Sequence, residues 1–106
     1  MNIASMMQKA QQMKSRMAEM QAEVMEMEIE GQSGGGLVKV STNGKGVVQS
    51  LDIQKDILNP DDKEMIEDLI TAAINDSRTK AEALISERTQ KIMTDLGLPA
   101  DMELPI

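Results

Sequence analysis

The side chains that could do chemistry are carboxylates, amines and guanidiniums, because the 106-residue chain contains no His and no Cys. This composition excludes Ser-His-Asp and Cys-His nucleophiles, thiol redox chemistry, disulfides and ordinary zinc sites. One acidic cluster remains as a candidate site for a metal ion or for acid-base catalysis: Asp61, Asp62, Glu64, Glu67 and Asp68.

The acidic cluster has a structural explanation. It follows Asn59-Pro60, which is typical of a helix start, and acids there stabilise the positive end of the helix dipole. The cluster lacks the spacing of a calcium-binding EF-hand loop. We therefore expect no enzymatic activity, no metal, no cofactor and no small-molecule substrate.

The basic residues are unevenly distributed along an acidic chain. The formal net charge is -7, which argues against indiscriminate binding to nucleic acid, yet residues 1–18 carry Lys9, Lys14 and Arg16 and no acid. Further along, Arg78, Lys80, Arg88 and Lys91 alternate with acids. The absence of Phe, Tyr and Trp removes the platforms on which unpaired bases stack. A local cationic patch on an acidic body remains possible.

A heptad pattern of apolar residues predicts a helix over about 3–27, a stretch without Gly or Pro. Methionine side chains adapt their shape to irregular surfaces, so this seam suits packing in the core or against a partner helix. The seam residues are Met6, Met13, Met17, Met20, Val24 and Met27.

Alternating residues and turn signals predict three antiparallel strands between about 28 and 54. Asn43-Gly44 is a hairpin signal that favours a positive φ, and Lys45-Gly46 extends the loop. The run GQSGGG matches no phosphate-binding loop and is expected to form a closely packed turn. A second amphipathic helix is predicted over about 60–96, followed by an extended tail over 97–106.

These elements predict a single α+β domain over residues 1–106, with a long N-terminal helix, a small three-stranded antiparallel sheet and a long C-terminal helix. At 1.5 Å per residue the second helix would span roughly 50 Å, whereas a compact chain of this size has a radius of gyration of about 13 Å. The helices must therefore project, and their apolar stripe closes most simply against a second copy. We expect a homodimer.

No apolar run approaches the roughly 18 to 20 residues that a membrane-spanning helix needs. The N-terminus also lacks the continuous apolar segment of a signal peptide. We therefore expect a cytoplasmic protein that does not bind membranes.

Several segments, taken in order, resemble the YbaB/EbfC family of bacterial nucleoid-associated proteins. They are the Met- and Gln-rich start MMQKAQQMKSRMAEMQAEV, the run EGQSGGGLVKV, the NG turn, DDKEMIEDLI, AAINDS and the closing LPADMELPI. The resemblance covers nearly the whole chain. One departure is the ending LPI, where a terminal aromatic residue is expected.

The resemblance implies a tweezer-like α/β homodimer that binds double-stranded DNA and alters its conformation. It implies a role in nucleoid organisation and gene regulation, and a location at the nucleoid. The DNA-contacting surface of the family is attributed to the terminal helices, which here points to Lys9, Lys14, Arg16, Arg78, Lys80, Arg88 and Lys91.

Two other function classes follow from the residues alone. A protein-interaction or chaperone-like scaffold could grip an apolar partner with the Met-rich seam, and the net negative charge favours this alternative. An enzyme that uses carboxylates and Mg²⁺ would depend on the acidic cluster, which helix capping already explains.

Overall fold

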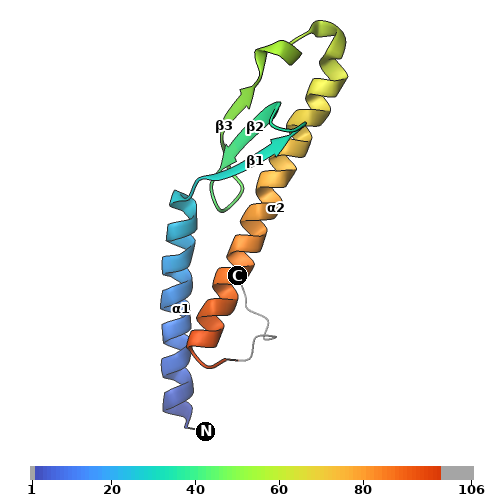
Figure 1. The fold of residues 1–106 in the computed structure, drawn as a ribbon. Coiled ribbons are helices and arrows are strands. Elements are labelled where there is room, and N and C mark those ends of the chain that lie inside the picture. Colours follow the sequence, from blue (N-terminus) through green and yellow to red (C-terminus); the bar gives the residue numbers. More distant parts are fainter. Residues whose placement is uncertain (1, 99–106) are drawn as a thin grey trace.

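The chain folds as a helix, three strands and a helix, and the computed structural model describes residues 2–98. The predicted α+β arrangement is confirmed (Figure 1). Two short 3₁₀ turns, Lys55–Ile57 and Pro60–Asp62, lie between the last strand and the second helix. The main elements are α1 (Ile3–Glu26), β1 (Ile29–Ser33), β2 (Val38–Thr42), β3 (Val48–Ile53) and α2 (Lys63–Asp95).

The molecule is elongated, as the length of the second helix predicts. Its extents are 68 × 23 × 18 Å and its radius of gyration is 19.0 Å, well above the value of about 13 Å for a compact chain of this size. Figure 1 shows the reason: the first half of α2 lies against the sheet, while its second half continues beyond the sheet beside α1. We call this antiparallel pair, α1 with the second half of α2, the arm.

An apolar cluster joins the two helices of the arm. Met20 and Val24 of α1 are buried together with Ile92 of α2, and Met17, Met27, Ile85 and Leu96 pack around them. The cluster uses the C-terminal part of the predicted seam. Toward the N-terminus the seam is less covered: Met13 is half-buried and Met6 is 53% exposed.

The sheet has the order β1-β2-β3, and both neighbouring pairs are antiparallel. Val38 and Val40 of β2 are buried against Ala73 of α2. Their partners in β3 are Ile53 and Leu51, so these two residues lie on the same face of the sheet. Leu51 is nevertheless 47% exposed, because α2 lies over β1 and β2 and leaves this part of β3 uncovered.

The turn between β2 and β3 differs from the expectation in the residue that carries the positive φ. The positive φ falls on Gly46, at 84°, and not on Asn43 or Gly44. The Asn43 side chain shapes the loop instead, because its Oδ1 accepts the N–H groups of Lys45 and Val47. Gly44 serves a close approach, since its N–H donates to the carbonyl of Val24 and a Cβ there would overlap that residue. The loop is therefore docked on the end of α1.

Small residues bring α2 unusually close to the sheet. Ala73, Ser77 and Ala81 lie four residues apart on the helix and are buried. The Ser77 hydroxyl donates to the carbonyl of Ile29 and also hydrogen-bonds the Thr42 hydroxyl. Opposite them, Gly31 has no side chain, and a Cβ at this position would overlap the backbone of Ala73 and Ser77. This contact sets the direction in which α2 leaves the sheet.

We expect Gly31→Ala to destabilise the protein by about 1–3 kcal/mol, the usual cost of overpacking, because the added methyl meets helix backbone that cannot rotate away. Urea unfolding followed by circular dichroism measures the loss. Glu30→Ala is the matched control, since Glu30 is the exposed neighbour on the other face of β1. Equal stabilities of the two variants would contradict this account of the contact.

Candidate nucleic-acid interface

The structure divides the seven candidate cations between two places. Arg78 and Lys80 lie where α2 passes the sheet. The other five lie on the arm, three on α1 and two on α2: Lys9, Lys14, Arg16, Arg88 and Lys91.

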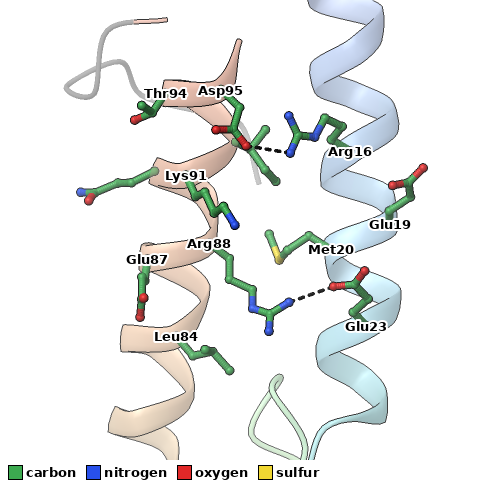
Figure 2. A pocket seen from close by; sticks show the side chains of 12 residues that line it. Arg16, Glu19, Met20, Glu23, Leu84, Glu87, Arg88, Lys91, Thr94 and Asp95 are labelled. Carbon is green, nitrogen blue, oxygen red and sulfur yellow. Dashed lines mark hydrogen bonds and ion pairs between the residues drawn. The ribbon is translucent and has the colours of Figure 1, made fainter. Parts of the chain in front are cut away.

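The two arginines of the arm are engaged in reciprocal ion pairs. Arg16 of α1 donates to Asp95 of α2 at 3.0 Å, and Arg88 of α2 donates to Glu23 of α1 at 2.8 Å (Figure 2). The partners on each helix are seven residues apart, so the two pairs lie about 10 Å apart along the arm. Because the helices run antiparallel, the same spacing on both brings each Arg opposite an acid. In one pair α1 therefore supplies the arginine and α2 the acid, and in the other pair the roles are reversed.

An open cleft of about 750 Å³ lies between the helices, around these ion pairs. Met20 and Lys91 point into it (Figure 2). The charged side chains that line the cleft are the cations Arg16, Arg88 and Lys91 and the acids Glu19, Glu23, Glu87 and Asp95. With three cations and four acids, the cleft as it stands has a small excess of negative charge and would not by itself attract a polyanion.

Three cations of the arm make no ion pair within residues 2–98: Lys9, Lys14 and Lys91. Lys14 and Lys91 are exposed, and Lys9 is half-buried. The first acid along α1 is Glu19, so Lys9 and Lys14 lie on an acid-free stretch of the helix. Flexible ammonium groups in this setting are suited to contact phosphate oxygens without regard to base sequence.

Arg78 and Lys80 instead tie α2 to the sheet. Arg78 donates its Nε–H to the carbonyl of Gly46 at 3.3 Å, which holds the β2–β3 loop. Lys80 donates to the carbonyl of Glu30 at 3.1 Å and pairs with Asp76 at 3.1 Å. Both side chains retain exposed surface, but their positively charged groups already have partners in the protein.

Asp76 completes this network at the outer edge of β1. Its Oδ2 accepts the backbone N–H of Gln32 at 3.0 Å. This hydrogen bond, and secondarily the hydrogen bond and charge of Lys80, lower the pKa of Asp76 below its ordinary value of 3.8. A strand edge that would otherwise present free backbone groups is thereby partly satisfied by side chains of α2.

Sequence reasoning identified the cations of the arm but not the acids that hold two of them. Glu23 and Asp95 are those acids. A signal was present, since Arg16 precedes Glu23 and Arg88 precedes Asp95 by seven residues each. It becomes interpretable only when the two helices are known to be antiparallel and in register.

Residues 2–98 offer neither a metal site nor a membrane-spanning helix. They contain no cluster of three or more acidic, His or Cys side chains arranged to hold a metal ion. In that same range no helix is both long and apolar enough to cross a membrane.

Comparison with known proteins gives the class of this fold. The model of the YbaB/EbfC DNA-binding family matches residues 1–96. Nucleoid-associated proteins of Granulibacter bethesdensis and Rhizobium meliloti are 45% and 44% identical to the chain over 104 residues, which is 98% of this chain and 97% of each relative. A crystal structure from Helicobacter pylori, described as an uncharacterized protein, superposes with a TM-score of 0.71 at 27% identity. The matched region covers 92% of this chain and 99% of the Helicobacter pylori chain.

The arrangement of a helix, a three-stranded sheet and a helix is thus the fold of a class of nucleoid-associated proteins. The chain belongs to the YbaB/EbfC DNA-binding family.

We expect Asp76→Asn to reduce the pH dependence of stability in the acid range. The pKa of Asp76 is lowered in the folded state, so its ionised form stabilises the fold above the unfolded pKa of about 3.9, and this contribution is lost as the pH falls through the folded value. Urea unfolding of both proteins from pH 6 to pH 3 should show a wild-type advantage at pH 6 that shrinks below about pH 4.

Lys80→Gln is the companion variant for this measurement. It removes the ion pair but leaves the hydrogen bond from Gln32, which is the larger cause of the lowered pKa of Asp76. Part of the pH dependence should therefore remain. Identical pH profiles for wild type and Asp76→Asn would show that this carboxylate does not contribute as described.

Proposed function

We propose that the protein is a homodimer that binds double-stranded DNA through the cations of its arms and alters the conformation of the DNA. In this way it contributes to nucleoid organisation and gene regulation in a bacterial cell. The observation that carries the proposal is the projecting arm with Lys9 and Lys14 on a helical stretch free of acids. The family match and the relatives named as nucleoid-associated proteins support it.

The electrostatics favour contact by the arm alone. With a net charge of -7, the protein as a whole repels DNA at long range. Close to the arm, each Lys or Arg that neutralises a phosphate releases a condensed counterion, and this gain is local. A dimer holds two arms at a set separation, so it can contact one duplex at two places and thereby bend it. Binding of this kind is modest in affinity and depends steeply on salt.

The uncovered part of β3 supports the homodimer. Apolar side chains are exposed on β3 and on the segments just before and after it in the chain: Val47 at 58%, Val48 at 41%, Leu51 at 47%, Leu58 at 57% and Met65 at 43%. Leu51 shares its face of the sheet with the buried Val40, so the core continues to the surface there. A second copy that covers this face would complete the core and leave both arms projecting.

One specific observation favours a second candidate function, that of a protein-interaction scaffold. The N-terminal end of α1 exposes Ile3 at 74%, Met6 at 53% and Met7 at 66%. Exposed methionines at a helix end suit the capture of an apolar helix or an unfolded segment of a partner protein. This protein-interaction scaffold would not need DNA.

The DNA-binding proposal is tested by titrating a duplex with the wild type and with the double variant Lys9→Gln, Lys14→Gln over a series of salt concentrations. The variant removes four cations per dimer, so the slope of log K against log salt should fall in magnitude by about 3.6, at roughly 0.9 per phosphate contact. The matched control is Lys39→Gln with Lys55→Gln, which removes the same charge outside the arm.

The outcomes separate the two candidate functions. An unchanged slope in the arm variant, or an equal change in the control, would exclude Lys9 and Lys14 from the interface. If the wild type ignores duplex DNA at physiological salt but binds an unfolded or helical client, the scaffold function replaces DNA binding.

We expect Leu51→Asp to raise the dimer dissociation constant by roughly 100-fold or more, because a buried unpaired carboxylate costs several kcal/mol. Sedimentation equilibrium measures this, with the wild type expected at twice the chain mass of 11.6 kDa. Ser50→Asp is the control, since Ser50 lies on the opposite face of β3. A wild type that stays monomeric at micromolar concentration would overturn the homodimer.

A further inference from the structure

The two arginines of the arm are already occupied. Each guanidinium donates to a carboxylate from the opposite helix, Arg16 to Asp95 and Arg88 to Glu23 (Figure 2). A carboxylate and a phosphate diester present the same kind of anionic oxygen, and a guanidinium binds both by charge-assisted hydrogen bonds. An arginine held by an acid of the same chain therefore already makes the kind of ion pair that it would make with a phosphate.

We propose that Asp95 and Glu23 act as internal competitors of DNA phosphate, and that DNA binding displaces them from Arg16 and Arg88. The proposal rests on the proposed binding of DNA by the arm. It assigns two phosphate sites, one at each guanidinium, and makes the two acids an autoinhibitory element. The acids lower the affinity that the cations alone would give.

The ion pairs are exposed enough to exchange. The side chains of Arg16 and Asp95 are each 40% exposed, and those of Arg88 and Glu23 are 35% and 61% exposed. Water reaches such pairs, and their net stabilisation is small. A phosphate from a polyanion, delivered at high local concentration, can therefore replace either carboxylate.

Exchange does not require the arm to come apart. Met20 and Val24 pack against Ile92 independently of the ion pairs, and this apolar contact holds the two helices together. Asp95 is also the last residue of α2, where a negative charge is unfavourable beside the negative end of the helix dipole. Its displacement or neutralisation therefore leaves the helix intact.

Displacement of the two acids changes how the DNA affinity depends on salt, whereas the loss of negative charge alone does not. Salt screens the exposed internal ion pairs as well as the contacts with DNA, so added salt weakens the competing carboxylate together with the phosphate contact. An arginine without an internal partner adds about 0.9 to the slope of log K against log salt. The wild-type slope should therefore be shallower than the number of its phosphate contacts alone would give.

The test compares duplex binding by three proteins across a salt series: the wild type, the double variant Glu23→Gln, Asp95→Asn, and the double variant Glu19→Gln, Glu87→Gln. The last pair is the matched control, since Glu19 and Glu87 line the same cleft but make no ion pair within residues 2–98. Both variants lose the same charge. Thermal unfolding checks that each is folded, and Asp95→Asn alone serves if the double variant is not.

We expect the Glu23→Gln, Asp95→Asn protein to bind more tightly than the control by about two- to fivefold for each pair removed. We also expect its salt slope to be steeper by up to about 0.9 for each freed arginine, with the control keeping the wild-type slope. A gain in affinity that the control matches, or an unchanged slope, would overturn the competition while leaving DNA binding by the wild type in place.

The remaining outcomes are also decisive. If only the Glu23→Gln, Asp95→Asn protein binds DNA, the internal acids are strong competitors and the inference is supported. If none of the three proteins binds duplex DNA at low salt, the proposed function fails and the competition fails with it.

Discussion

The close contact between α2 and the sheet is the constraint on which the remaining structure depends. Gly31 leaves room for the backbone of Ala73 and Ser77, and the Ser77 hydroxyl bridges two strands. A single 33-residue helix then serves two purposes, because its first half covers the sheet while its second half forms the arm. A helix is stiff over this length, so whatever sets its angle on the sheet also sets the position of the charged side chains at its far end.

The charges of the arm follow from this geometry. A protein with a net charge of -7 can offer DNA only a local surface, and the stretch of α1 before Glu19 is such a surface, with Lys9, Lys14 and Arg16 and no acid. The arm also carries Glu23 and Asp95, which hold Arg16 and Arg88 across the cleft. In the proposed binding mode, one pair of helices would carry both the cations that attract phosphate and the acids that compete with it. The proposed affinity for DNA would then be a balance between intramolecular and intermolecular ion pairs of similar strength.

The small size of the domain accounts for the uncovered apolar face. One helix is wide enough to cover two strands, so β3 keeps Leu51 and Val48 exposed although their partners in β2, Val40 and Thr42, are buried. Residues 2–98 contain no further helix to cover them. Association with a second copy would supply the missing layer, and it would also bring a second arm into the same assembly. The proposed dimer and the proposed DNA binding therefore have a common origin in the shape of the monomer.

The sequence by itself determined the elements and their order. The heptad of methionines, the glycine-bounded strands and the Asn59-Pro60 start all depend on local periodicity or on the backbone preferences of single residues, which are readable without a structure. Tertiary structure alone decided which residues meet. Arg16 and Asp95 are 79 residues apart in the chain, and Arg78 and Lys80 contact backbone carbonyls that no periodicity indicates. The positive φ lies on Gly46 and not on the Asn-Gly pair, because the Asn43 side chain accepts a hydrogen bond from the loop backbone and Gly44 packs on Val24. Such contacts depend on the register between elements distant in sequence, and that register is set by the close packing of α2 on the sheet.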